Sequence, residues 1–304
     1  MNHSKISIRV PATTANVGPA FDCMGIALNY YNYMQCELTD SDISFNITGV
    51  GAGKLPANSK NIIYKAFAST AVLIGTKFTG VKFYCQNNIP LNHGLGSSSA
   101  AIVSGILSAN LLLNGGLSKH EMVEIAAKIE GHPDNVAPAV LGGVTVSAQS
   151  GARINSVRFL PKADLKFIVA IPDYEVPTRL ARAALPKYIA HSDGVFNAAR
   201  AALLTAALFT GDLESLAAAL DDKLHQPHRA YLMPGMKQVF AAAKQAGAVG
   251  AVISGAGPTM LAIAAGNADC AAIGAAMVGG FNEAGKTACY KILYMDVDGA
   301  SAVQ

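Results

Sequence analysis

The sequence predicts an α+β fold built from two consecutive units, and three observations support this prediction. The first 50 residues read as successive strands, and segments with helical periodicity follow them. The pattern starts again at about residue 162, where the apolar run LKFIVAIPD follows a more polar stretch. A chain of 304 residues is long enough for one large or two ordinary domains. We therefore predict domains at residues 1–161 and 162–304.

The first unit is predicted to alternate strands and helices. Its three opening strands, KISIRVP, NYYNYMQCELT and ISFNITG, have the period-two alternation of apolar and polar residues. The remaining elements are a helix at 61–75, a strand at 81–90, a helix after Ser99, a helix in SKHEMVEIAAKIEG and a strand at 142–148. Ser118 and Glu121 form a capping-box pattern at the start of the third helix, which is expected to end at Gly131 and to carry Glu130 in its last turn.

The second unit is predicted to be a small two-layer sandwich. Four segments read as strands, namely LKFIVAI, GAVISG, MLAIAA and YKILYMDV. Between them come an alanine-rich helix at 197–220 and a helix in MKQVFAAAKQAG. This alternation is typical of two layers, with helices covering one face of a sheet.

The composition excludes several classes of protein. The uncharged window at 246–266 contains a cluster of glycines and a proline that divides it into two runs of strand length, so it is not a membrane span. Because no apolar signal core follows the N-terminus, we expect a cytoplasmic protein. The five cysteines never form CxxC and are expected to be buried thiols. With a net charge of +3, no Trp and only scattered basic pairs, a small anionic ligand is favoured over nucleic acid.

The segment PLNHGLGSSSAA forms a glycine turn between a predicted strand and a predicted helix. The first N–H groups of a helix lack intrahelical partners and carry partial positive charge, so this position suits an anion. Gly94 and Gly96 would let a phosphate approach the backbone, and Ser97, Ser98 and Ser99 supply hydroxyls. The segment is neither a Walker A loop nor a dinucleotide fingerprint. Taken alone, the same residues could equally cap a buried helix.

Four further segments are rich in glycine, proline and polar residues between apolar flanks, which is typical of a site on a rigid scaffold. They are VPATTANVGPAFDCMGIAL, EGHPDNVAPAVLGG, EVPTRLARAALP and SGAGPTMLAI. Together with GLGSSSAA they resemble, in order and over nearly the whole chain, the signature motifs of the GHMP small-molecule kinases. That resemblance implies an N-terminal domain like domain 2 of ribosomal protein S5, a ferredoxin-like C-terminal domain and ATP-dependent phosphorylation of an alcohol. The EGHPDNVAPA and HQPHR segments imply L-homoserine as the acceptor, on the route to threonine, and family precedent makes a homodimer plausible.

The resemblance also implies which residues bind ATP and Mg²⁺. A helix terminus stabilises an anion by only about 0.3 to 2 kcal/mol, so a triphosphate needs a metal ion as well. Ser98 and Glu130 match the family's Mg²⁺ ligands. The expected ATP-binding residues are Asn61, Pro90, Gly94, Leu95, Gly96, Ser97, Ser98, Ser99 and Ala100.

The acceptor pocket is expected to offer opposite charges to the two ends of a zwitterion. By resemblance, Arg182 and Arg229 would hold the carboxylate, although a surface salt bridge is the alternative for either arginine alone. The residues expected around the ammonium, the hydroxyl and the backbone of the acceptor are Asn16, Asp22, Asp134, Asn135, Thr178, Gly255 and Gly257. His132, His225 and His228 are expected to be structural.

The sequence contains no clear equivalent of the Asp–Lys pair that sister kinases are thought to use as a base. We therefore expect direct transfer, with Asn135 orienting the hydroxyl and Asp134 as the alternative base. Two other functions stay open. A mevalonate-type or shikimate-type kinase would have a different acceptor pocket, and a non-catalytic ligand sensor would lack Mg²⁺ ligands.

Overall fold

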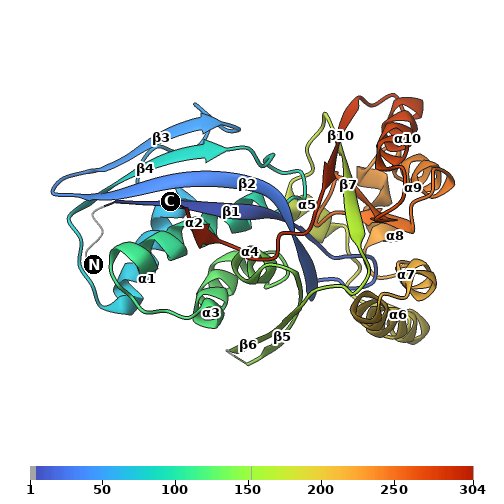
Figure 1. The fold of residues 1–304 in the computed structure, drawn as a ribbon, viewed down its shortest axis with the longest axis horizontal. Coiled ribbons are helices and arrows are strands. Elements are labelled where there is room, and N and C mark those ends of the chain that lie inside the picture. The colour runs from blue at the N-terminus through green and yellow to red at the C-terminus, as the bar shows by residue number, and fades with distance from the viewer. Residues whose placement is uncertain (1–4, 152, 304) are drawn as a thin grey trace.

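The computed structural model describes residues 5–151 and 153–303, which fold around two β-sheets set side by side (Figure 1). The first sheet has the strand order β11-β1-β2-β4-β3, and β5 and β6 continue it from β2. Its strands are β1 (Lys5–Ala15), β2 (Met24–Thr39), β3 (Ile43–Gly49), β4 (Gly80–Asn87), β5 (Val144–Ser150), β6 (Arg153–Phe159) and β11 (Ser301–Ala302). The neighbours β3 and β4 are parallel, whereas β1 and β2 form a long antiparallel pair.

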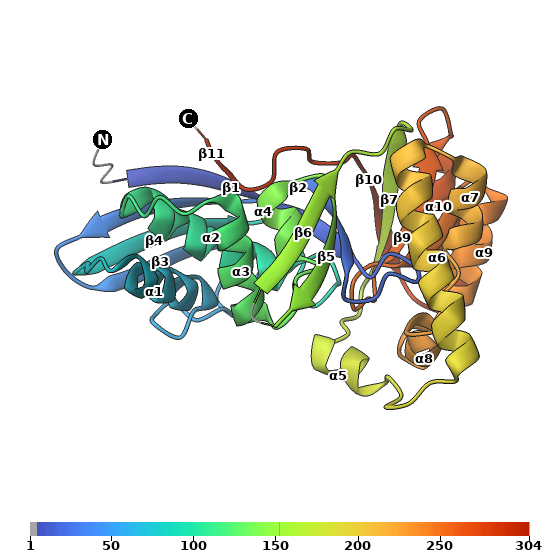
Figure 2. The same ribbon diagram turned by 90° about the horizontal axis from the view of Figure 1, so that it is seen from below.

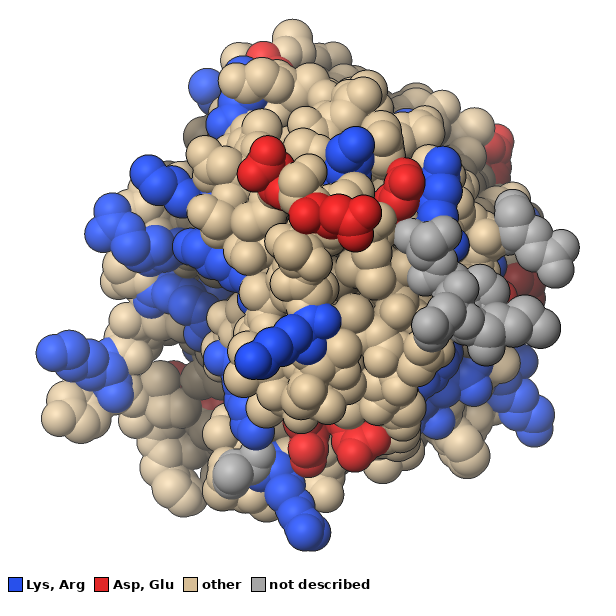
Figure 3. Space-filling view, turned by 90° about the vertical axis from the view of Figure 1, so that its left-hand side faces the viewer, with Lys and Arg blue, Asp and Glu red and all other residues tan. Residues whose placement is uncertain are grey.

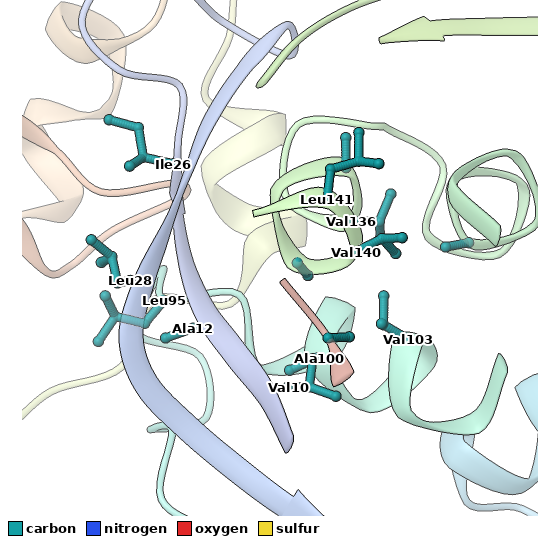
Figure 4. Close-up of a cluster of buried hydrophobic side chains, with 14 of the residues drawn as sticks. Val10, Ala12, Ile26, Leu28, Leu95, Ala100, Val103, Val136, Val140 and Leu141 are labelled. Carbon is teal, nitrogen blue, oxygen red and sulfur yellow. The ribbon is translucent and has the colours of Figure 1, made fainter. Parts of the chain in front are cut away.

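Four helices cover one face of this sheet (Figures 1 and 2). They are α1 (Ile62–Ile74), α2 (Ser97–Leu112), α3 (Lys119–Glu130) and α4 (Val136–Leu141). Buried residues occur all around α2, as expected for a helix enclosed by the other elements. Figure 4 shows the core that β1, β2, α2 and α4 build together, in which Val10, Ala12, Val103 and Val140 are at most 1% exposed.

Local signals in the sequence fix where these helices begin. The side chain of Asn61 accepts a hydrogen bond from the Ile63 N–H at 2.9 Å and caps α1. The capping box predicted at Ser118 and Glu121 is confirmed, with Glu121 Oε2 2.8 Å from the Ser118 N–H. Gly131 ends α3 in the left-handed conformation, so Glu130 is the last residue of that helix, as predicted.

The second sheet confirms the ferredoxin-like prediction. Its strand order is β10-β7-β9-β8, and every neighbouring pair is antiparallel. The strands are β7 (Leu165–Pro172), β8 (Gly250–Ile253), β9 (Met260–Ala265) and β10 (Ala288–Leu293). Helices α9 (Met236–Gln245) and α10 (Cys270–Glu283) pack on one face. The other face joins the core of the first sheet, together with α6 (His191–Thr210) and α7 (Leu213–Ala219). The short helices α5 (Thr178–Ala183) and α8 (Gln226–Arg229) lie near the junction of the two sheets (Figure 2).

One sequence prediction of secondary structure was wrong, and some elements were not predicted. The helix expected at 197–220 is two helices, because Gly211 takes a left-handed φ of 81° after α6 and Asp212 then caps α7 by accepting from the Ser215 N–H at 3.0 Å. Strand β6, which pairs with β5 as a hairpin, was not predicted. The domain boundary at residue 161 stays a prediction, but β11 near the C-terminus returns to pair with β1 of the first sheet.

The charged side chains on the face in Figure 3 are spread over the surface. Several Lys and Arg side chains gather along the left-hand edge and others lie at the lower right, whereas Asp and Glu form small groups in the upper middle and at the bottom. Within the described ranges, no helix is long and apolar enough to cross a membrane.

Candidate active site

The glycine loop leads into α2 with the geometry of an anion site. Gly94 and Gly96 both have a φ of 71°, which side chains rarely allow. A Cβ on Gly94 would lie 2.1 Å from the carbonyl oxygen of Ser254, and one on Gly96 would lie 2.0 Å from Thr13 Oγ1. Gly96 is the N-cap of α2 and provides no side-chain cap, so the first N–H groups of the helix are available to a ligand.

Glu130 brings a carboxylate to this helix terminus. Its Oε2 accepts a hydrogen bond from Ser98 Oγ at 2.9 Å, and its Oε1 accepts one from Ser99 Oγ at 3.0 Å. The two predicted metal ligands, Ser98 and Glu130, therefore lie together although 32 positions separate them in the sequence. A carboxylate beside a hydroxyl, next to a phosphate-binding helix end, fits the oxygen donors that Mg²⁺ takes in kinase sites.

Asn135 and Asp134 lie next to this terminus at the start of α4. The Thr13 hydroxyl donates to Asn135 Oδ1 at 2.8 Å, which directs the amide nitrogen of Asn135 the other way, toward Asp134 Oδ1 at 3.3 Å. Asp134 is 1% exposed, and its carboxylate is bonded to Nδ1 of His132. Burial by itself lowers the pKa of His132, but the hydrogen bond to Asp134 and the charge of that carboxylate raise it above the ordinary value.

A second carboxylate, that of Asp22, completes an acidic cluster. Ligand atoms of Asp22, His132 and Asp134 all lie within 4.8 Å of one another. Asn16 fixes the backbone of Asp22. The Asp22 N–H donates to Asn16 Oδ1 at 2.8 Å, and the Asn16 amide donates in turn to the Gly255 carbonyl at 2.9 Å. The cluster therefore has the spacing at which one cation could contact both carboxylates.

Two arginines lie beside the acidic cluster. Arg182 on α5 forms a two-pronged ion pair with Asp22, with N–O distances of 2.7 and 3.0 Å. Arg229 at the end of α8 is 1% exposed, and its Nε and Nη1 donate to the carbonyl oxygens of Ala181 and Gly255, both at 3.1 Å. Burial, together with the charge of Arg182, lowers the pKa of Arg229 to about 10, so it stays charged at neutral pH.

One cavity of about 380 Å³ collects most of the predicted site residues. Those on its wall are Asn16, Asn61, Pro90, Gly94, Gly96, Ser97, Ser98, Ser99, Glu130, Asp134, Asn135, Thr178, Arg182, Arg229 and Gly255. Four others are not on this wall. Leu95 and Ala100 are fully buried in the core below the loop (Figure 4), Asp22 lies against Arg182, and Gly257 lies against Met233.

One end of the cavity is lined by residues from β2, α1 and the glycine loop. Asn61 lies on this wall, but both ends of its amide already have partners, since Nδ2 donates to the Pro56 carbonyl at 2.7 Å and Oδ1 caps α1. Its predicted part in ATP binding stays a prediction. Lys60 and His93 also line this part of the cavity and were not predicted.

Sequence reasoning missed two residues beside the reacting groups. Thr13 orients Asn135, and its only signal is its place three residues before Asn16 in a polar segment. His132 was expected to be structural, yet it lies on the cavity wall and bonds to Asp134. Its signal is its position two residues after Glu130, in a loop that starts directly after a helix.

Two family models match the chain. The model for the GHMP kinases N terminal domain matches residues 61–143, and the model for the GHMP kinases C terminal region matches residues 203–280. Among curated proteins, the homoserine kinase of Moorella thermoacetica is 43% identical over 278 residues, covering 91% of this chain and 93% of that protein. The homoserine kinase of Trichormus variabilis is 44% identical over 300 residues, covering 98% of this chain and 99% of that protein.

Solved structures with the same fold include enzymes that are named for different activities. A homoserine kinase from Cytophaga hutchinsonii superposes with a TM-score of 0.92 at 30% identity, covering 100% of this chain and 98% of that chain. A phosphomevalonate kinase from Streptococcus pneumoniae superposes with a TM-score of 0.70 at 13% identity, covering 99% of this chain and all of that chain. The second similarity concerns the fold alone.

Proposed function

This chain belongs to the GHMP kinase family, and from that premise we propose that it transfers the γ-phosphoryl group of ATP to the hydroxyl of L-homoserine. The products are O-phospho-L-homoserine and ADP. The full-length similarity to homoserine kinases supports the acceptor, and so does the chemistry of the cavity. One observation carries the proposal: a helix terminus suited to phosphate opens into the same cavity as Asn135, Arg182 and Arg229.

The nucleotide is expected to bind with its phosphates at the start of α2. Backbone N–H groups of Ser97, Ser98 and Ser99 would contact phosphate oxygens, where a negative charge also meets the positive end of the helix dipole. Ser98 and Glu130 would hold Mg²⁺, which neutralises charge on the phosphates when it is bound. Glu130 would then exchange its hydrogen bond from Ser98 for the shared metal ion.

The acceptor is expected to bind by its two charges. Its ammonium would lie between the carboxylates of Asp22 and Asp134, whose spacing allows contacts of about 2.8 Å to both. Its carboxylate would face the guanidinium groups of Arg182 and Arg229. Arg182 and Asp22 bond to each other in the structure, and a zwitterion gives each of them a partner of opposite charge.

Transfer is expected to proceed directly, without a side chain that removes the hydroxyl proton first. Phosphoryl transfer passes through a loose transition state in most analyses, so the hydroxyl becomes acidic only as the new P–O bond forms. The amide of Asn135, fixed by Thr13, would orient the hydroxyl in line with the γ-phosphate. The proton leaves with the phosphorylated product or to solvent, and the broken P–O bond releases ADP.

The test is ADP release by the purified protein with ATP and Mg²⁺. L-homoserine, mevalonate, shikimate and buffer without acceptor are compared, each with and without EDTA. We expect turnover with homoserine alone and its loss in EDTA. Turnover with mevalonate or shikimate instead would identify that compound, and not homoserine, as the acceptor. Nucleotide binding without turnover of any acceptor would favour a ligand sensor.

Two expectations about the whole chain stay predictions. We propose domains at 1–161 and 162–304, with the final strand β11 of the second range paired to the sheet of the first domain. Limited proteolysis followed by mass spectrometry would test this division. We also propose a homodimer, which sedimentation velocity at several protein concentrations would test. Neither affects the chemistry above.

A further inference from the structure

His225, a residue that the mechanism above does not use, lies directly behind Arg229. It is fully buried and precedes α8 as its N-cap residue. Its Nε2 lies 2.7 Å from the carbonyl oxygen of Gly18, and its Nδ1 lies 3.3 Å from Arg229 Nη1. The ring therefore connects the loop after β1 to an arginine of the acceptor pocket.

Its two partners select one form of the ring. A carbonyl oxygen can only accept a hydrogen bond, so Nε2 must carry the proton. A guanidinium can only donate, so Nδ1 must be unprotonated. His225 is therefore the neutral tautomer with its proton on Nε2, and a second proton on Nδ1 would point at a positive charge.

The hydrogen bonds of the Arg229 guanidinium leave one of its nitrogen atoms for a ligand. Nε is bonded to the Ala181 carbonyl, and Nη1 is shared between the Gly255 carbonyl and His225. Among the described residues, Nη2 has no hydrogen-bond partner, and Arg229 lines the cavity. His225 thus contacts the guanidinium on the side away from that free end.

We propose that His225 is a positioning residue, which holds the guanidinium of Arg229 so that Nη2 faces the carboxylate of the acceptor. This inference rests on the proposed function, because it needs an acceptor with a carboxylate. It assigns a role in acceptor binding to a histidine that touches neither substrate. Since the same contact would serve the ground state and the transition state, it acts on the KM for homoserine rather than on kcat.

Burial keeps the ring neutral, and the two charged groups beside it act in opposite directions. Arg229 faces Nδ1, and Asp222 Oδ2 lies 3.6 Å from Nε2, beyond hydrogen-bond distance. The Asp222 carboxylate is already bonded to three backbone N–H groups and to the Asn197 amide. The ring of Phe21 packs beside the imidazole, and the two ring centroids lie 5.4 Å apart. Burial, helped by the charge of Arg229, lowers the pKa of His225 despite the opposing charge of Asp222.

Two variants separate the two contacts of the ring. In His225→Asn the amide lies near the position of Nδ1 and keeps an acceptor for Arg229. In His225→Gln the longer side chain reaches the position of Nε2 and keeps a donor for Gly18. We expect His225→Gln to raise the KM for homoserine about tenfold, the size of one hydrogen bond to a charged group, while kcat and the KM for ATP stay within about twofold. His225→Asn should have kcat and KM values close to those of the unchanged protein.

The reference is Arg229→Lys, which should raise the KM for homoserine by itself. Adding His225→Gln to it should have little further effect, because both act through one guanidinium. The unchanged protein gives an independent readout that does not depend on folding of a variant. Because burial lowers the pKa of His225 below its ordinary value, its protonation should raise the KM for homoserine, but not that for ATP, only at a pH well below that value.

Each possible outcome decides the matter. A raised KM in His225→Asn with a normal KM in His225→Gln would mean that the ring only anchors the loop at Gly18, and the inference would be wrong. Equal losses in kcat and in both KM values of His225→Gln would overturn it as well. If the unchanged protein does not phosphorylate homoserine, or Arg229→Lys leaves the KM normal, the proposed function fails first and this inference falls with it.

Discussion

Replacing Asp22 by Asn should weaken homoserine binding far more than it weakens the fold. The substitution keeps the shape of the side chain and removes its charge. In the structure the carboxylate makes a two-pronged pair with Arg182, and in the proposed complex it faces the ammonium of the acceptor. The ion pair contributes to the free energy of unfolding, and the contact with the ammonium contributes to homoserine binding. The two roles can therefore be measured separately.

The structure allows both magnitudes to be worked out. The side chains of Arg182 and Asp22 are 38% and 33% exposed, and an ion pair with that exposure contributes only about 0.2 to 1 kcal/mol to stability. A hydrogen bond to a charged group is worth about 1.5 to 3 kcal/mol, and the amide of Asn retains part of it. Taking the lower value, at about 1.4 kcal/mol per factor of ten, the KM for homoserine should rise about tenfold.

The assay compares homoserine with 4-hydroxybutanoate, the same molecule without its ammonium. Asp22→Asn should raise the KM for homoserine about tenfold and leave that for 4-hydroxybutanoate unchanged or lower, since no ammonium loses a partner. Asp298→Asn is the matched control, because Asp298 forms an ion pair with Arg9 at 3.3 Å on the exposed surface. Equal changes for the two acceptors, or an unchanged KM for homoserine, would refute the pairing of Asp22 with the ammonium.

Three further predictions concern the metal site, the acceptor pocket and the glycine loop. Glu130→Gln should lower turnover at least about 100-fold and raise the Mg²⁺ concentration needed for half-maximal rate, as seen in a Mg²⁺ titration; an unchanged titration would remove Glu130 from the metal site. Asp134→Asn should retain near-normal kcat at saturating homoserine, whereas a loss of several orders of magnitude in steady-state assays would make Asp134 the base. Gly96→Ala should cost about 2 kcal/mol or more of unfolding free energy in urea, because its Cβ would meet Thr13 Oγ1 at 2.0 Å in a left-handed backbone. A loss below about 1 kcal/mol would contradict that account.

Much of the fold could be predicted because its signals are local. Alternation gave the strands, and Ser118 with Glu121 fixed the start of α3. The helix at 197–220 was predicted as one piece because alanine favours helix on both sides of Gly211, although Gly211 followed by Asp212 is a stop and start signal in the sequence. Strand β6 escaped notice because its burial alternates only between half-buried and exposed positions, so its apolar period is weak.

The site was predicted less completely, because its decisive contacts join distant parts of the sequence. Glu130 with Ser98 could be paired through the family resemblance, and the structure places them in hydrogen-bond contact. Nothing in the sequence indicated that Arg182 bonds to Asp22, 160 positions away. Likewise, a buried histidine such as His225 looks the same in sequence whether it fills the core or supports an arginine. Such roles depend on which atoms face each other, and residue types alone do not determine this.

The return of β11 to the first sheet turns the second sheet and its helices into an insertion with two covalent tethers. The chain leaves the first sheet after β6 and comes back through residues 294–296, where Tyr294 O accepts from the Asn29 N–H and Asp296 N–H donates to the Ala27 carbonyl. A pair of domains on one linker can swing in any direction, but two tethers permit rotation chiefly about the line that joins them. Residues of β7, β9, α6 and α7 share one buried core with β1, β2 and α2, which opposes such a rotation. The two tethers and this core together fix the distance across the cavity between Arg182 on α5 and Glu130 at the end of α3.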